Sequence, residues 1–221
     1  MSRCPQERCA RGSQRWMQWY VNQAPHALDA AVGLGPIDWR SPLRDDEYAE
    51  YRDEAFLERL GVTAARRSLE SFWPRGGPQW DALGRATSGE AVIIEAKAHL
   101  NELYSPTTHA LDASLALIQA SLAEAARALG VREGFDWSRQ FYQYANRLAH
   151  AYFLQQANGV PVKLVFVYFV GDSDMKGPAT QGEWEGAIGT VHAALGLTHP
   201  PPFVRDVFIE VGPGSEGPLP V

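Results

Sequence analysis

Cysteine is scarce in this 221-residue chain, and long apolar runs are absent. Cys4 and Cys9 lie near the N-terminus without the histidines or further cysteines that would complete a zinc site. We expect reduced thiols there, with a disulfide or a metal role as the minor alternative. No segment approaches the roughly 20 consecutive apolar residues of a membrane helix, and residues 1–8 lack the apolar stretch of a signal peptide. These absences predict a cytoplasmic protein with no membrane partner.

Positive charge is also in short supply. The chain has 20 Lys and Arg against 26 Asp and Glu, a formal net charge of −6 and a pI near 5.5. This balance argues against a protein that coats nucleic acid non-specifically, because that mode needs clustered Lys and Arg against the phosphates. It leaves room for an enzyme that grips one phosphate through cations and a local basic patch. Arg66, Arg67 and Arg75 are the best candidates for that patch.

Apolar and aromatic residues are abundant enough for a folded core. They make up 45% and 11% of the chain, and such side chains are rare in sequences that cannot fold. The length suits one domain, which we place at residues 13–211. Residues 1–12 are expected to be flexible, and the Gly/Pro-rich residues 212–221 are expected to form a loose tail.

Hydrophobic spacing and breaker residues predict alternating helices and strands. Helices are expected over 13–33, 45–60, 112–129, 136–158 and 182–196. Strands are expected over 65–70, 79–86, 91–98, 162–170 and 203–211. The run 162–170 is almost continuously β-branched or aromatic, which is typical of a central strand covered on both faces. This order predicts an α/β fold, a three-layer sandwich with a central mixed β-sheet flanked by helices.

The chemistry is concentrated in the expected hairpin of residues 79–98. Glu95 and Lys97 are two residues apart on a strand, so their side chains project from one face. If the hairpin turns about Ser88, paired residue numbers sum to 176, twice 88, and Asp81 falls opposite Glu95. Two facing carboxylates destabilise a sheet unless a cation compensates them. The sequence therefore predicts a cation site at this position.

A divalent metal is the simplest compensating cation. Carboxylate oxygens of Asp81 and Glu95, with the Ala96 carbonyl as a further candidate, are the hard ligands that suit Mg²⁺ or Mn²⁺. Lys97 would lie beside the metal, where it can stabilise negative charge on a phosphate or orient and help deprotonate the attacking water. This set of groups is suited to phosphodiester hydrolysis.

An Asp in one strand, a gap, and Glu-x-Lys in the next strand ahead of a helix resemble the PD-(D/E)XK nuclease signature. The match is Asp81 with Glu95-Ala96-Lys97, and Trp80 stands where the family usually has Pro. The resemblance covers roughly residues 45–170. It implies a restriction-endonuclease-like fold and a Mg²⁺- or Mn²⁺-dependent nuclease. It also implies a nucleic-acid partner, DNA rather than RNA, in a restriction, repair or defence context.

Two further groups of residues fit this resemblance. Members often carry an acidic residue on the helix before the strands, and on a helical wheel of 45–60 Asp53 fits that role better than Glu50 or Glu54. The stretch from Gln140 to Tyr144 is similar to the Gln-x-x-x-Tyr element of some exonuclease branches. We therefore expect Asp53 at the metal, Gln143 beside the catalytic Lys97, and a substrate-binding flank formed by Gln140, Tyr144 and Arg147.

Less specific interpretations remain open. The Asp81, Glu95 and Lys97 face is alternatively a salt-bridged strand surface exposed to water. Asp53 is as well explained by pairing with an arginine, and the helix flank by packing at the core edge. The acidic turn at residues 171–174 is a weaker metal candidate, and His99 is more often structural or solvated. The chain as a whole is alternatively a catalytically silent nucleic-acid-binding or protein-interaction module, and a homodimer is left open.

Overall fold

The computed structural model describes residues 2–108 and 110–211, which build one mixed β-sheet of five strands and a smaller sheet of two. The expected tail at 212–221 lies outside the described residues. The five strands follow the spatial order β2 (Ile37–Ser41), β4 (Ala82–Ala86), β5 (Ala91–Lys97), β6 (Val162–Val170) and β7 (Val204–Glu210). β4 is antiparallel to both its neighbours, whereas β5, β6 and β7 run parallel. The mixed sheet predicted from the sequence is thus confirmed.

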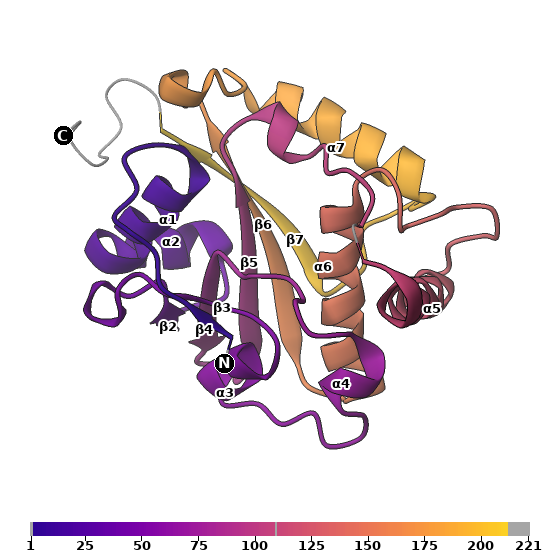
Figure 1. Cartoon of the computed structure of the whole chain (residues 1–221). Coiled ribbons are helices and arrows are strands. Elements are labelled where there is room, and N and C mark those ends of the chain that lie inside the picture. The colour runs from indigo at the N-terminus through magenta and orange to yellow at the C-terminus, as the bar shows by residue number, and fades with distance from the viewer. Residues whose placement is uncertain (1, 109, 212–221) are drawn as a thin grey trace.

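Helices cover both faces of the sheet (Figure 1). One face packs against α1 (Gly12–Gln23) and α2 (Pro25–Val32). The other face carries α3 (Glu54–Leu60), α4 (Leu69–Phe72), α5 (Asp112–Ala128), α6 (Tyr142–Tyr152) and α7 (Gln181–Leu195). Among the described residues, none of these helices combines the length and apolar character needed to cross a membrane. The arrangement agrees with the expected three-layer α/β sandwich.

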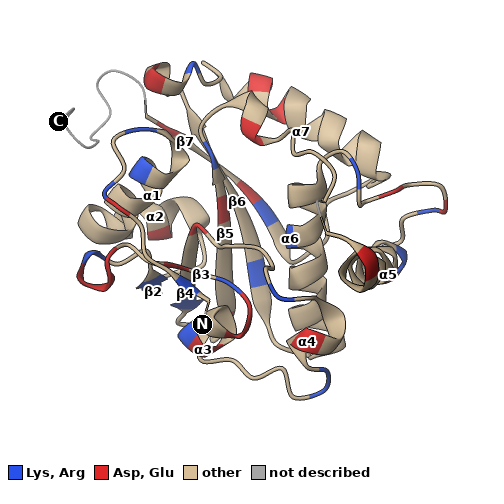
Figure 2. Cartoon of the chain, viewed as in Figure 1, with Lys and Arg blue, Asp and Glu red and all other residues tan. Residues whose placement is uncertain are grey.

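Side-chain alternation along the central strands divides the core in two. On β5, Ile93 joins the cluster under α5, α6 and α7, whereas Val92 and Ile94 join the cluster under α1 and α2. Glu95 and Lys97 have the same parity as Ile93, so they point toward α6. Figure 2 shows one acidic and one basic position near the carboxyl end of β5, which is otherwise uncharged. The alternation directs both side chains into the larger helical layer, where Glu95 meets Arg147 of α6.

The register of the β4–β5 hairpin matches the predicted one. Ala82 pairs with Ile94 and Arg85 with Ala91, and both sums are 176. Asp81 immediately precedes β4, and its backbone N–H extends the ladder by donating to the Ile94 carbonyl at 3.1 Å. Asp81 and Glu95 consequently lie side by side at one end of the hairpin.

The helix predicted over 45–60 is wrong in its first half. Residues 44–46 form a short 3₁₀ turn, η1 (Arg44–Asp46), and β3 (Glu50–Tyr51) is a strand that pairs with β1 (Arg3–Cys4). Glu47, Tyr48 and Asp53 have positive φ angles, which interrupt any helix, so α3 begins only at Glu54. Here pairing with a distant segment overrides local helix propensity. That pairing also holds residues 3–4 within the segment expected to be flexible.

Three other boundaries differ for local reasons. Pro25 lacks an N–H and starts a new helix, so the expected helix 13–33 is split into α1 and α2. The predicted strand 65–70 gives way to α4, which the Ser68 hydroxyl caps by accepting from the Ser71 N–H. The helix expected from Asp136 starts at Tyr142, because Phe141 has a φ of 60°. Strand β2 was not predicted.

His150 of α6 is buried in an aromatic box against Phe72, Trp73 and Trp80. Burial lowers the pKa of its imidazole to about 3. The unfolded chain therefore takes up a proton near pH 6.5 that the folded chain refuses, so stability falls as the pH drops from about 6.5 toward 3. Between these pH values His150 should lower the free energy of unfolding by about 1.4 kcal/mol per pH unit, and we expect His150→Phe to abolish this contribution. Chemical denaturation at several pH values measures it. Replacement of the exposed His199 by Gln should leave the slope unchanged.

Candidate functional site

Glu95 lies at the centre of a buried charged cluster at the carboxyl end of β5. The residue is 4% exposed, and both carboxylate oxygens are occupied. Lys97 Nζ donates to Oε1 at 2.5 Å, and Arg147 Nε of α6 donates to Oε2 at 2.6 Å. Burial raises the pKa of Glu95, but the two cations outweigh burial and hold that pKa below its usual value. Glu95 is therefore ionised at neutral pH.

Arg147 ties this cluster to the chain segment that leads into β4. One guanidinium nitrogen, Nη2, donates to the Gln79 carbonyl at 3.0 Å, and Nη1 donates to the Asn146 side chain at 2.8 Å. The guanidinium also lies over the Trp80 ring, 5.1 Å from its centroid. All three guanidinium nitrogens are thus engaged, and Arg147 is 7% exposed. Arg147 was predicted from the sequence to bind substrate, whereas in the structure its guanidinium forms an ion pair with Glu95.

Asp81 is the carboxylate without a cation of its own. Its Oδ2 accepts a hydrogen bond from the Ala96 backbone N–H at 2.7 Å, and its Oδ1 accepts none from any described residue. Burial raises the pKa of Asp81 well above its usual value, and the nearby charges of Glu95 and Glu50 raise it further, against a smaller lowering by Lys97. Asp81 is thus held where a negative charge lacks compensation.

Glu50 is the third carboxylate of the cluster, and sequence reasoning passed over it. It lies on β3, is 4% exposed, and accepts from Gln79 Nε2 at 2.5 Å and from Gln14 Nε2 at 2.9 Å. Burial is the main cause of its raised pKa, to which Glu95 adds. The antiparallel bridge between Tyr51 of β3 and Trp80, the neighbour of Asp81, brings Glu50 here, and β3 also pairs with β1. No local pattern in the sequence signals that pairing.

The cluster contains three carboxylates, Asp81, Glu95 and Glu50, against two cations, Lys97 and Arg147. In the described part of the chain, no three His, Cys, Asp or Glu side chains stand ready as a metal-binding group. The uncompensated charge on Asp81 and the hard oxygen chemistry of all three acids nevertheless fit a divalent cation such as Mg²⁺ or Mn²⁺. Asp81, Glu95 and Glu50 are the residues that would hold it.

Asp53 does not join the cluster. Its Oδ1 accepts from the backbone N–H groups of Gly76 and Gly77 at 3.0 and 2.9 Å, and its Oδ2 accepts from the Ser2 hydroxyl at 2.9 Å. It thereby ties the N-terminus to the loop that precedes β4. The expected metal role rested on the helical wheel of 45–60, and that helix is absent at residue 53. The alternative, pairing with an arginine, is also absent: Asp53 forms no ion pair with any described residue.

The flank expected on α6 is divided among three environments. Gln140 lies outside the helix and is exposed, and Gln143 is exposed on its first turn. Tyr144 is buried, stacks on Phe166 at 4.2 Å between centroids and shares a 2.8 Å hydrogen bond with His192. Of the four expected residues, Arg147 alone touches the charged cluster.

An open groove of about 590 Å³ lies beside Arg147. Its lining includes Arg75, Gln79, Gln143, Asn146 and Arg147, together with residues 105–108, 110 and 111. Arg147 and Gln79 belong both to this groove and to the cluster around Glu95. The groove therefore borders the cluster through these two residues, none of the three carboxylates lines it, and it contains one arginine of the expected basic patch.

The remaining candidates have structural partners. Asp172 accepts from the Trp16 indole N–H at 2.8 Å, and Asp174 pairs with Arg15. Arg67 pairs with Glu124, and His99 lies 3.4 Å from Glu102.

The less specific interpretation of the motif as a water-exposed salt-bridged surface does not hold, because Glu95 and Lys97 are 4% and 8% exposed. Isolating an ion pair from water costs several kcal/mol per ion, so such a cluster is an expensive feature for a fold to retain. Compared with known proteins, the chain matches no family model, no curated protein and no solved structure.

Proposed function

We propose that this protein is a Mg²⁺- or Mn²⁺-dependent phosphodiester hydrolase of the PD-(D/E)XK type that acts on nucleic acid. DNA is the first candidate substrate. The observation that carries the proposal is the register of the hairpin. It sets Asp81 beside Glu95, with Lys97 on the same buried face and an excess of negative charge at Asp81. Charged residues that serve only solubility lie exposed to water, whereas these groups are buried together.

The element order also supports a restriction-endonuclease-like fold. Within residues 45–170, helices α3 and α4 precede the antiparallel strands β4 and β5, and α5 and α6 then lead to the parallel strand β6. This is the plan of a helix, strands, a helical region and a further strand that the resemblance implies. The motif residues lie at the end of the β4–β5 hairpin, where the plan requires them.

Each residue of the cluster has a distinct part in the proposed reaction. Asp81, Glu95 and Glu50 would hold the divalent ion, which as a Lewis acid stabilises charge on the phosphate and lowers the pKa of water. Lys97 keeps its ammonium beside Glu95, where it can donate to a phosphate oxygen or orient the attacking water. Arg147 keeps Glu95 ionised and fixes its rotamer, because it donates to the opposite oxygen. Arg147 is in this account a positioning residue.

Lys97→Met tests the proposed function directly. The variant keeps the length of the side chain but loses the ammonium, and we expect cleavage of a DNA substrate with Mn²⁺ to fall by about 10² to 10³-fold. Lys176→Met removes a lysine from an exposed turn and serves as the matched control. Unchanged cleavage in Lys97→Met would remove the lysine from the mechanism. Metal-dependent cleavage by neither wild type nor control would favour a silent fold.

The groove predicts different effects for two neighbouring glutamines. Gln143 lines the groove, whereas Gln140 is exposed outside it. We expect Gln143→Ala to raise the KM for an oligonucleotide about fivefold with little change in kcat, since one lost hydrogen bond is worth roughly 1 kcal/mol. Gln140→Ala should behave like wild type. Steady-state kinetics of both variants measures the difference, and equal KM values would remove the groove from the substrate path.

A catalytically silent nucleic-acid-binding protein is the second candidate. It is favoured by the engagement of both Glu95 oxygens with Lys97 and Arg147, which already neutralises that carboxylate. In such a protein Asp81 alone would face a cation. Binding of DNA without cleavage under any divalent ion, together with no metal binding by the protein, would select this alternative.

A further inference from the structure

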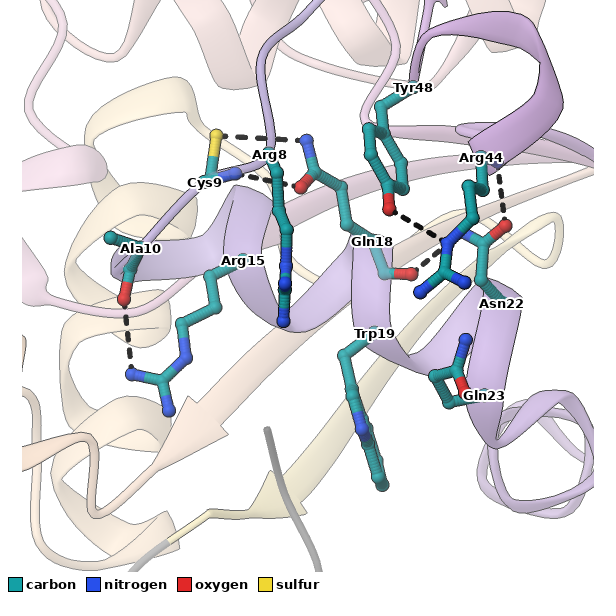
Figure 3. A pocket seen from close by; sticks show the side chains of 10 residues that line it. All are labelled: Arg8, Cys9, Ala10, Arg15, Gln18, Trp19, Asn22, Gln23, Arg44 and Tyr48. Carbon is teal, nitrogen blue, oxygen red and sulfur yellow. Dashed lines mark hydrogen bonds between the residues drawn. The ribbon is translucent and has the colours of Figure 1, made fainter. Parts of the chain in front are cut away.

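A small pocket lined by arginines lies where the N-terminal segment passes along α1 (Figure 3). Its lining includes Arg8 from the segment before α1, Arg15 and Trp19 from α1, and Arg44 from η1. None of the ten described residues that line it is acidic. In a chain with a net charge of −6, this is a local concentration of positive charge.

The guanidinium groups differ in how far they are already engaged. Arg15 is held by the Ala10 carbonyl at 3.2 Å and by Asp174 at 3.0 Å. Arg44 donates through Nε to the Tyr48 hydroxyl at 3.2 Å, which leaves both its Nη atoms without a partner among the described residues. Arg8 is exposed and forms no hydrogen bond or ion pair with any described residue. Arg8 and Arg44 thus retain guanidinium N–H donors that have no acceptor among the described residues.

The size of the pocket limits what can enter it. Its volume is about 50 Å³, and one water-sized group needs roughly 10 to 15 Å³ on that scale, so about four such groups fit. A tetrahedral oxyanion has this size, whereas a nucleobase does not. Guanidinium groups recognise phosphate oxygens through short charge-assisted hydrogen bonds. Size and donor chemistry together therefore favour a phosphate group.

The pocket is connected to the carboxylate cluster by two hydrogen bonds. Cys9, which lines the pocket, lies with its Sγ 3.2 Å from Gln14 Oε1, and Gln14 donates to Glu50 at 2.9 Å. The groove beside Arg147 meets the same cluster from the α6 side through Gln79. The charged cluster therefore lies between a neutral-to-basic groove and a basic pocket.

We propose that the Arg8, Arg15 and Arg44 pocket binds a phosphate group of the nucleic-acid strand next to the one that is cleaved. That the phosphate belongs to a nucleic acid rests on the proposed function, whereas phosphate binding in the pocket does not. The phosphate is either a strand end or an internal backbone phosphate, and both present the same oxygens. It sets the register of the strand against Asp81 and Lys97.

The test uses the full chain in EDTA, which prevents cleavage. Calorimetry with inorganic phosphate compares wild type with Arg8→Gln/Arg44→Gln and with Arg132→Gln, an exposed arginine elsewhere on the surface. Anisotropy is measured with single-stranded oligonucleotides that carry a 5′-phosphate, a 3′-phosphate or no terminal phosphate. We expect the double variant to lose phosphate binding and to bind oligonucleotide about tenfold more weakly. The slope of log affinity on log salt should fall by about one per lost contact.

The outcomes separate this proposal from the proposed nuclease activity. Weakening for one phosphorylated end assigns the pocket to a terminal phosphate, and equal weakening for all three oligonucleotides assigns it to an internal one. Unchanged phosphate and oligonucleotide binding in the double variant overturns the proposal, even if the protein cleaves DNA. Phosphate binding that depends on the arginines supports it, even if no cleavage is found. Arg8→Gln alone, which removes no internal contact, controls for misfolding.

Discussion

Asp81→Asn is expected to lower phosphodiester cleavage by about 10² to 10³-fold while the metal-free protein becomes more stable. Asparagine has the same shape and can still accept from the Ala96 N–H, which Asp81 Oδ2 does at 2.7 Å. It removes only the negative charge, which burial and two neighbouring carboxylates make unfavourable. A residue kept for the fold would show the opposite sign, a loss of stability without a specific loss of activity.

The pH dependence gives the same variant a second readout. Because burial, Glu95 and Glu50 raise the pKa of Asp81 above its unfolded value, ionised Asp81 opposes folding at high pH. The wild-type protein should therefore gain stability relative to Asp81→Asn as the pH falls through the raised pKa, until the unfolded carboxyl is also protonated. Denaturant titrations at a series of pH values measure the difference. A difference that grows as the pH falls would contradict the burial of an uncompensated charge.

Arg147→Met should produce the largest loss of stability. It leaves Glu95 buried with only Lys97 as a partner, and removing one member of a buried pair costs about 3–5 kcal/mol. The lost contacts to the Gln79 carbonyl and over the Trp80 ring act in the same direction. Urea unfolding of the purified variant measures the change in the free energy of unfolding.

The double variant Glu95→Gln/Arg147→Met separates charge from packing. If the cost comes from an unpaired carboxylate, the double variant should recover much of the stability lost in Arg147→Met. If the two substitutions simply add, packing of the arginine is the main effect and the positioning role of Arg147 fails. Arg139→Met, at an exposed ion pair with Asp136, is the matched control and should change stability by less than about 1 kcal/mol.

Local patterns predicted the centre of the site well. The apolar run of β6 and the spacing of Asp81, Glu95 and Lys97 depend on residues near each other in sequence, and the hairpin forms in the register that these spacings imply. Strand alternation was enough to place Glu95 and Lys97 on one face. What it did not predict was that α6 would cover this face and bury it.

Long-range contacts account for what the sequence did not predict. Glu50 enters the cluster because Tyr51 of β3 bridges to Trp80, next to Asp81, while β3 also pairs with the distant β1, and no local signal marks either contact. Asp53 was expected at the metal from a helix that positive φ angles interrupt. Arg147 was correctly placed on α6, but its partner Glu95 lies 52 residues away. The spacing of residues along the chain does not indicate which distant side chains will be in contact.

The most direct test of the proposed metal-dependent site is a calorimetric titration with Mn²⁺ of the wild-type protein, Asp81→Asn and Lys176→Met. We expect wild type and Lys176→Met to bind Mn²⁺ with the same affinity and Asp81→Asn to bind it at least tenfold more weakly, as the proposed site requires. Equal binding by wild type and Asp81→Asn would contradict it.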